Sequence, residues 1–406
     1  EVYDAEYGLR IDGSTLNYIY SNLFDACYIG IYADNATSQT INHDIRYNSY
    51  KCTYLLKDPY SGQQNYPDNF NNANIPDRIS YAGIALRNTL VLKVSHEIYE
   101  GTRNGIIMNA GVVDAQYCAF TDLVGDNVDF TNVSVSLNES GIGIYQIEDI
   151  RGKRRFCNFT NVYFGDFLSG KFGNIYGSLD YYKCNYTDIR KEGLNASGIY
   201  INLTGKMDLT IDDCDFLNTI RGITMRHSQF KTLDITNSVF ELNNGTTNDY
   251  CRGIEFTNAS ISFMGSVSNN NFTMNSSGSA VLGWSTGFTH TIFEDNTIYL
   301  NQSKSTGFEI YNNSQNLYKG NQIYAASSLS SIGFDMLGNI GSGSGSYYCC
   351  NAVTGANLGV RYSGYAAKLV SFGDDANIKN FNFTNNNTGL YLYNATIEEQ
   401  PYAGNL

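Results

Sequence analysis

Apolar and polar residues alternate in short segments along the chain, and the same pattern returns many times. The segment 207–216, MDLTIDDCDF, shows it clearly: Leu209 and Ile211 alternate with polar residues, Cys214 follows, and Phe216 comes two positions later. The pattern is h-x-h-x-x-(Asn/Cys)-x-h, where h is an apolar residue. Such alternation predicts short β-strands, and its recurrence predicts an internal repeat.

Thirteen segments align on the Asn/Cys position, which we call the slot. An apolar residue follows two positions after every slot, and neighbouring slots are 24 to 39 residues apart. Asn suits the slot because it tolerates a left-handed corner and its amide can bond to the next repeat. The slot residues are Asn22, Cys52, Asn88, Cys118, Cys157, Cys184, Cys214, Ser238, Asn270, Asn296, Asn321, Asn351 and Phe381.

A second strand signal, a glycine followed by apolar residues, comes after the slot. It begins eight residues later in six repeats, at Gly30, Gly165, Gly222, Gly278, Gly359 and Gly389, and is delayed in others. The remaining residues of each repeat are rich in Asn, Thr and Gly and leave no room for a regular helix. Although 230–240, FKTLDITNSVF, also fits a leucine-rich repeat, the pattern favours a coil of about three short parallel strands.

The combination of Asn-x-h with Gly-Ile-x-h resembles the right-handed parallel β-helix repeats of pectate-lyase-like proteins. The Asn-, Tyr- and Phe-rich sequence with Cys in the slot is also similar to secreted or surface β-helical proteins of Bacteroidota. The resemblance implies an all-β fold: one right-handed parallel β-helix solenoid over residues 1–406, with about 13 coils and Asn/Cys and Phe/Ile ladders. Lyases, glycosidases, tailspikes and adhesins share this fold, so the resemblance does not identify the function.

Two segments interrupt the repeat. Residues 57–80 contain three of the four prolines, which cannot serve an interior strand ladder, so we predict a lateral loop there. Residues 125–155 lengthen another coil and are predicted as a second loop excursion, which ends in the basic run 151–155. The first loop carries aromatic and amide side chains suited to carbohydrate contact, unless it is a solvated excursion: Tyr60, Gln63, Tyr66 and Phe70.

The composition excludes several functional classes. A formal net charge of −13 argues against nucleic acid or anionic lipid as the main partner, because both need a basic face. No run of 18 or more apolar residues is present, so no membrane span is predicted. The chain begins with Glu1, from which we expect a processed piece of a longer, exported precursor, with flanking domains or self-association covering its strand edges.

Nine cysteines are present, an odd number that cannot pair completely. We interpret the slot cysteines as reduced, buried residues; a disulfide between neighbouring repeats is the alternative. No His accompanies them at ligand spacing, so no metal is predicted in the slot. No cofactor is expected elsewhere, except that acidic and carbonyl-rich loops would suit Ca²⁺, although no D-x-D-x-D-G loop is found.

The best catalytic candidates are basic residues beside the strand glycines. Arg221 and Arg252 each precede such a glycine and should stack on adjacent coils, with Arg226 and His227 nearby. The resemblance implies that arginines could serve a polysaccharide lyase there. The alternative is that Glu192, Asp249 and Glu255 neutralise them. For a hydrolase, Asp212, Asp213 and Asp215 offer carboxylates on one coil.

Our first hypothesis is a secreted or cell-surface structural or adhesive β-helix. It would serve as an adhesin, surface-layer or filament component, and would contact glycans or other surface proteins. The alternative is a polysaccharide lyase or glycoside hydrolase that acts on an acidic polysaccharide. The regular repeat without a convergent catalytic set favours the first hypothesis.

Overall fold

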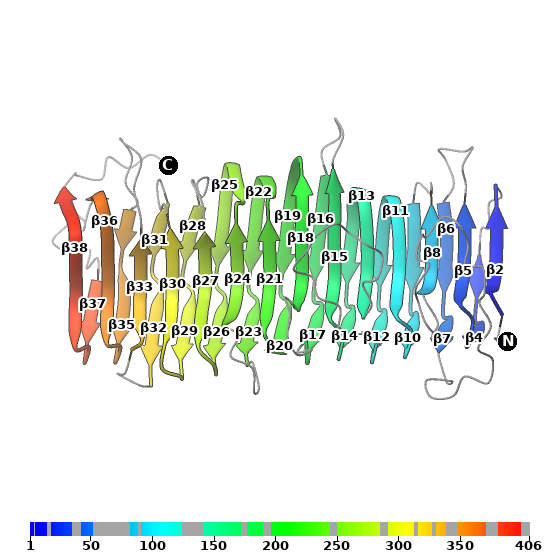
Figure 1. Ribbon diagram of the computed structural model, residues 1–406, viewed down its shortest axis with the longest axis horizontal. Coiled ribbons are helices and arrows are strands. Elements are labelled where there is room, and N and C mark those ends of the chain that lie inside the picture. Colours follow the sequence, from blue (N-terminus) through cyan, green and yellow to red (C-terminus); the bar gives the residue numbers. More distant parts are fainter. Residues whose placement is uncertain are drawn as a thin grey trace, which may run out of the picture. The chain divides into compact units, whose positions relative to one another are not determined.

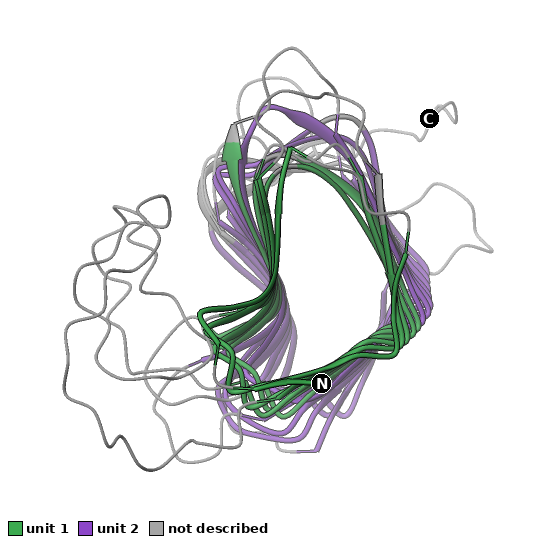
Figure 2. Ribbon diagram, turned by 90° about the vertical axis from the view of Figure 1, so that its right-hand side faces the viewer, with its two compact units in different colours: residues 1–171, 184–199 green, residues 172–183, 200–406 purple. Residues whose placement is uncertain are grey.

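The computed structural model describes most of the chain, and all regular structure in the described part is β-strand (Figure 1). The described residues are 1–3, 5–13, 18–34, 42–51, 82–87, 91–123, 141–171, 177–189, 196–243, 250–284, 291–311, 316–326, 330–337, 347–370 and 381–398. They divide into two compact units, residues 1–171 with 184–199, and residues 172–183 with 200–406 (Figure 2). No helix of the described residues is long and apolar enough to span a membrane.

Each unit is a parallel β-helix in which three rows of strands run along the stack, and each strand pairs with its equivalent in the next coil. The first row consists of short strands that directly follow the slot. In unit 1 these are β1 (Val2–Tyr3), β4 (Leu23–Asp25), β7 (Ser49–Lys51), β10 (Ile98–Glu100), β12 (Ala119–Thr121), β14 (Asn158–Thr160) and β17 (Asn185–Thr187). In unit 2 they are β20 (Asp215–Thr219), β23 (Val239–Leu242), β26 (Asn271–Met274), β29 (Thr297–Leu300), β32 (Gln322–Ala325), β35 (Asn351–Thr354) and β37 (Phe381–Thr384).

The second row contains the strands with the predicted glycine signal. It comprises β2 (Tyr7–Asp12), β5 (Ile29–Asp34), β8 (Ala82–Arg87), β15 (Phe164–Lys171), β18 (Ser197–Thr204), β21 (Arg221–Arg226), β24 (Cys251–Thr257), β27 (Gly278–Trp284), β30 (Ser305–Tyr311) and β33 (Ile332–Leu337). Four long strands continue from this row into the third row: β11 (Asn104–Gln116), β13 (Ile142–Arg155), β36 (Leu358–Val370) and β38 (Thr388–Glu398).

The third row carries the alternating pattern that precedes each slot. Its strands are β3 (Ile19–Tyr20), β6 (Asn42–Arg46), β9 (Val91–Ser95), β16 (Gly177–Tyr182), β19 (Lys206–Asp212), β22 (Gln229–Thr236), β25 (Ser260–Ser268), β28 (Thr291–Glu294), β31 (Leu317–Lys319) and β34 (Tyr347–Cys349). Alternation appears directly in their burial: Leu209 and Ile211 of β19 are buried, while Thr210 between them is exposed.

Strand register confirms most of the predicted slots and corrects two. Leu23 pairs with Ser49, and Ser49 with Ile98, so the second and third slots hold Asn48 and Glu97 rather than Cys52 and Asn88. The backbone N–H and side-chain amide of Asn48 both donate to Glu97 Oε1, at 3.0 and 3.2 Å. The sequence pattern alone does not decide between Asn48 and Cys52, because Tyr50 and Tyr54 each follow two positions later. Glu97 departs from the pattern because a buried carboxyl can also accept these bonds.

Aromatic rings stack inside unit 1 two positions after the slot. The centroids of Tyr99 and Phe120 are 4.6 Å apart and their planes differ by 1°; Phe120 and Phe159 follow at 4.7 Å. Glycines of the second row pack directly against this ladder. A Cβ added to Gly83, for example, would lie only 2.5 Å from the ring of Tyr99. The repeated glycine signal therefore reflects close packing against the rings.

In unit 2 the slot asparagines form a continuous polar ladder. The side-chain amide of Asn270 donates to Asn296 Oδ1, that of Asn296 to Asn321 Oδ1, and that of Asn321 to Asn351 Oδ1, at 3.1, 2.9 and 2.9 Å. The left-handed corner expected at the slot lies one residue earlier, for example at Asn269 with φ of 57° and at Asp295 with φ of 52°. The slot therefore selects Asn for its amide bonds rather than for its backbone conformation.

The remaining predictions on organisation fall partly outside the described residues. The loop 57–80, with Tyr60, Gln63, Tyr66 and Phe70, lies outside them, as do residues 124–140. Residues 142–155 of the second predicted excursion instead form β13, which pairs with β11. The basic run 151–155 is thus part of a strand. Cys118, Cys157, Cys184 and Cys214 are buried, and no disulfide joins the cysteines of the described part.

Candidate functional site

Three predicted arginines converge on one buried carboxylate in unit 2. Arg221 of β21 pairs in register with Arg252 of β24, as the repeat predicts. Glu255 of β24 is 2% exposed, and its carboxylate lies 2.8 Å from Arg252 Nη1, 3.5 Å from Arg221 Nε and 3.6 Å from Arg226 Nη2. Glu255 therefore relieves the repulsion between the stacked guanidinium groups.

The electrostatics of this cluster favour a fixed ion network over a catalytic base. Burial alone would raise the pKa of Glu255, but the guanidinium groups of Arg252 and Arg221 outweigh it and lower that pKa. Thr257 Oγ1 also donates to the Glu255 carboxylate at 3.0 Å. A carboxylate held by several cations stays ionised and keeps the arginines paired. Of the predicted neutralising acids Glu255 plays that part, while Glu192 and Asp249 lie outside the described residues.

His227 does not join the cluster. It follows β21 in a left-handed turn with φ of 50°, is exposed, and its Nε2 lies 3.3 Å from the side-chain amide nitrogen of Asn258 in the next coil.

The three aspartates that were the candidates for a hydrolase have different positions and partners. Asp212 accepts from Thr236 at 2.8 Å, Asp213 occupies the turn and lies 3.4 Å from Lys183, and Asp215 begins β20.

A groove adjoins the arginine cluster on the same row of strands in unit 2, and we call it the unit 2 groove. Its volume is about 460 Å³, and strands β24, β27, β30, β33 and β36 contribute to it. Arg252 contributes a cation from β24 and Arg361 another from β36, while Glu309 and Asp335 contribute carboxylates from β30 and β33. Glu309 pairs in register with Asp335, and Asp335 with Arg361.

The carboxylates of the groove are held by specific partners. Arg361 Nε donates to Asp335 Oδ1 at 2.7 Å, and its second nitrogen reaches Oδ2. Burial raises the pKa of Asp335; Arg361 opposes this shift and Glu309 adds to it. Ser279 Oγ and Tyr311 Oη donate to the two oxygens of Glu309, the latter at 3.2 Å. The groove is thus lined by oriented polar groups.

Exposed aromatic side chains border these polar groups. Trp284, the only tryptophan of the chain, ends β27 and is 54% exposed. Its ring stacks on Tyr311 of β30 with a centroid distance of 4.7 Å, and both Trp284 and the exposed Tyr250 line the groove. A large exposed aromatic surface beside ordered polar groups is typical of a binding site.

Sequence reasoning missed Trp284, Tyr311, Glu309, Asp335 and Arg361. Their signal is their place in the strands that carry the glycine: Glu309 and Asp335 each lie two residues after the glycine of their strand, at Gly307 and Gly333. Aligning the chain on these glycines would have placed the two acids in one row. The calcium prediction gains no candidate, because no three His, Cys, Asp or Glu side chains of the described residues group as metal ligands.

Comparison with known proteins gives little beyond this geometry. No protein-family model matches the chain, and none of the curated proteins compared with it matches. Among solved structures, the chain is similar to a mutant of the periplasmic alginate epimerase AlgG, with 11% identity, 93% of this chain and 76% of that chain covered, and a TM-score of 0.25. A likeness this low carries no argument, so the fold assignment rests on the strand pairing.

Proposed function

We propose that the protein is a secreted or cell-surface β-helix that binds a glycan in the unit 2 groove. The observation that carries the proposal is the Trp284–Tyr311 stack beside the ordered carboxylates and arginines. A sugar has apolar C–H faces and a rim of hydroxyls. The exposed indole would cover the apolar face, while Glu309, Asp335 and Arg361 would bond the hydroxyls.

The shape of the groove supports a chain-like ligand. The polar groups of the groove come from neighbouring strands spaced by roughly 4.8 Å. A polymer lying across β30, β33 and β36 would meet Glu309, Asp335 and Arg361 in turn, because these residues are in register. The stacked coils would serve as a rigid scaffold that presents this face, in keeping with an adhesive or structural surface protein.

The proposal is tested by binding measurements on a panel of immobilised neutral and acidic glycans. Trp284→Ala should weaken binding to the recognised glycan about fivefold to tenfold, because the lost aromatic contact is worth on the order of 1 kcal/mol. Tyr324→Ala is the matched control: Tyr324 is an exposed aromatic stacked on Tyr299 at 5.4 Å but lies outside the groove. No binding to any glycan, or equal loss in both variants, would contradict the proposal.

A glycoside hydrolase is the second candidate function. Glu309 and Asp335 face one groove from neighbouring strands, and the raised pKa of Asp335 is a property that a general acid needs. A lyase centred on Arg221 and Arg252 is less well supported, because Glu255 occupies both guanidinium groups. Release of reducing ends from the recognised glycan, abolished in Glu309→Gln and Asp335→Asn, would establish the enzyme; intact glycan after long incubation would exclude it.

A further inference from the structure

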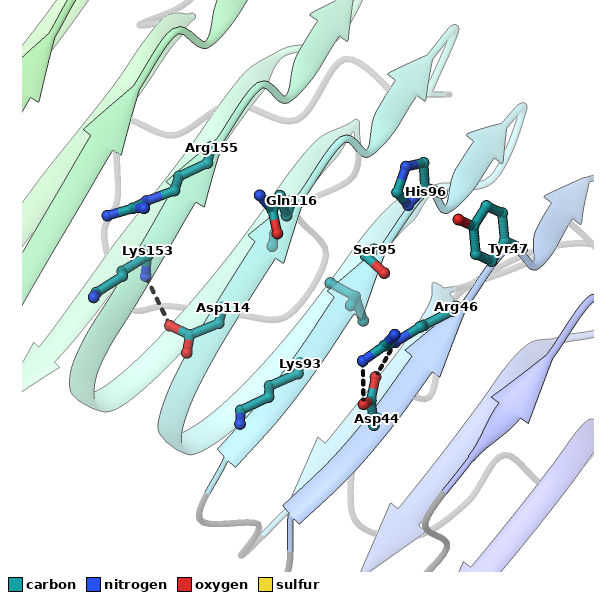
Figure 3. Close-up of a pocket in the computed structure, with 12 residues that line it drawn as sticks. Asp44, Arg46, Tyr47, Lys93, Ser95, His96, Asp114, Gln116, Lys153 and Arg155 are labelled. Atoms are coloured by element: carbon teal, nitrogen blue, oxygen red, sulfur yellow. Dashed lines mark hydrogen bonds and ion pairs between the residues drawn. The ribbon is translucent and has the colours of Figure 1, made fainter.

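A second groove lies on the outer face of unit 1, and we call it the unit 1 groove. It has a volume of about 390 Å³, and Figure 3 shows its side chains rising from neighbouring strands β6, β9, β11 and β13. Strand register places its residues in two rows. One row contains Asp44, Lys93, Asp114 and Lys153, and the other contains Arg46, Ser95, Gln116 and Arg155.

The unit 1 groove carries a local positive charge. Four cationic side chains, Arg46, Lys93, Lys153 and Arg155, outnumber the two carboxylates, which leaves a balance of +2 with histidine counted as neutral. The carboxylates are already engaged: Asp44 accepts two bonds from Arg46 at 2.8 and 2.7 Å, and Asp114 accepts one from the backbone N–H of Lys153 at 3.1 Å.

The two lysines are available to a ligand. Both are exposed, and within the described part of the chain their ammonium groups have no hydrogen-bond or ion-pair partner. Lys93 and Lys153 lie two strands apart, with Asp114 between them in the row. A ligand that bridges them must therefore extend along the stack of coils for roughly 10 Å.

A ladder of rings lies at the turn beside these rows. Tyr47 stacks on His96 with a centroid distance of 4.5 Å, His96 on Tyr117 at 4.9 Å, and Tyr117 on Phe156 at 4.8 Å. All four residues adopt left-handed φ values between 54° and 58°, which places them at equivalent corners of their coils. Because the rings cover one another's faces, the ladder offers mainly ring edges, with the hydroxyls and imidazole as its polar groups.

We propose that the unit 1 groove binds a linear glycan carrying carboxylate or sulfate groups, at a site separate from the unit 2 groove. The anionic groups pair with Lys93 and Lys153, and the sugar hydroxyls bond to Tyr47, His96 and Tyr117. The net charge of −13 repels a polyanion. Acids that lie more than about 8 Å from the groove are screened at physiological salt, so a locally positive groove can still hold a polyanion. The covered ring faces disfavour a single-stranded nucleic acid, which stacks its bases on open aromatic faces.

Binding of four polymers to the whole protein tests the proposal: polygalacturonate for carboxylate, heparin for sulfate, dextran as a neutral glycan and oligothymidylate as a nucleic acid. We expect binding of at least one acidic glycan that weakens as salt rises, and any binding of dextran should be unchanged in the lysine variant. The double variant Lys93→Gln, Lys153→Gln should lose about tenfold in affinity, whereas the exposed control Lys206→Gln should bind as the parent does.

The outcomes separate this site from the proposed function. Trp284→Ala should leave acidic-glycan binding by the unit 1 groove intact, and the double lysine variant should leave the unit 2 groove intact. Three results would each overturn the proposal: no binding of either acidic glycan, an unchanged affinity for the acidic glycan in the double variant, or tighter binding of oligothymidylate than of the acidic glycans. Circular dichroism of the double variant verifies that it is folded, which the exposure of both lysines leads us to expect.

Discussion

Asn270 and Asn296 occupy the same position in neighbouring coils, and Asn270 donates both its backbone N–H and its side-chain amide to Asn296 Oδ1, each at 3.1 Å. The same amide of Asn270 also reaches the carbonyl of Ile235 at 2.9 Å. One buried oxygen thus satisfies two donors of the preceding coil. This explains why an amide, rather than any polar residue of similar size, recurs in unit 2.

Asn296→Ala tests the energetic weight of this ladder. The substitution leaves the backbone N–H and one amide hydrogen of Asn270 without an acceptor, so we expect a loss of about 2–4 kcal/mol in the free energy of unfolding, measured by urea denaturation. Asn296→Ser should lose less, because Ser238 fills the same slot and its Oγ accepts from Cys214 N at 3.2 Å.

Asn301→Ala is the control for the same chemistry at the surface. Asn301 donates to Asn275 Oδ1 at 3.0 Å in an exposed ladder, where water can replace the lost bond. We expect a loss below about 0.5 kcal/mol. Equal losses in the buried and exposed ladders would show that the slot bonds do not stabilise the coils.

Gly83→Ala tests the packing of glycine against the ring ladder. A Cβ there would lie 2.5 Å from the ring of Tyr99 and 3.0 Å from the carbonyl of Gly105, so the coils must separate or the ring must tilt. We expect a loss of about 2–3 kcal/mol in urea denaturation. In the control Gly13→Asn, no atom lies within 4 Å and φ is +60°, which Asn tolerates; a comparable loss there would contradict the packing explanation.

Glu97→Gln tests the buried carboxyl in the slot of unit 1. Burial raises the pKa of Glu97 to about 8, against the bonds from Asn48 that lower it. The folded state therefore binds the proton more tightly than the unfolded state, and stability falls as pH rises from about 4.5 to about 8. Glutamine keeps an acceptor for Asn48 and cannot ionise. The unfolding temperature of the variant should lack this pH dependence and should be higher than that of the parent at pH 8. Identical pH profiles for the two proteins would contradict the raised pKa of Glu97.

Glu255→Gln tests a buried carboxyl whose pKa is lowered, in contrast to the raised pKa of Glu97. The pKa of Glu255 is lowered, so its stabilising contribution is fully present above the ordinary value of 4.5 and is lost as pH falls through the lower folded value. The variant leaves three guanidinium groups without their common carboxylate, and we expect a loss of about 3 kcal/mol at pH 7. Its deficit relative to the parent should shrink below pH 4.5 in urea denaturation, and a deficit that grows there would contradict the assignment.

The sequence predicts the repeat well because one-dimensional spacing carries it. The h-x-h pattern before the slot and the apolar residue after it correspond to buried positions such as Leu209, Ile211 and Phe216, whose environment depends only on the neighbouring coil. Glu97 was missed even though Leu92, Val94 and Tyr99 complete the pattern around it. A carboxyl in the slot is unexpected until the donors of Asn48 are seen beside it.

The grooves were less predictable because they depend on loops of unequal length. Arg221 and Arg252 were expected to stack because both precede a strand glycine. In contrast, Glu309 and Trp284 come to line one groove through the register of β27 and β30, in which Glu309 pairs with Leu282. Tyr47, His96 and Tyr117 stack although their corners are separated by 49 and 21 residues in the sequence. Only the strand pairing shows which residues share a face.

Distance measurements by electron paramagnetic resonance between spin labels in unit 2 test the central claim, the coil stack, most directly. Glu241, Thr273, Tyr299, Tyr324, Thr354 and Thr384 follow one another in register on successive strands. Labels at Glu241 and Tyr324 span three coil steps, and labels at Glu241 and Thr384 span five. At roughly 4.8 Å per step, the second distance should exceed the first by about 10 Å, with narrow distributions for both. Equal distances, or a broad distribution for either pair, would contradict the stacked β-helix.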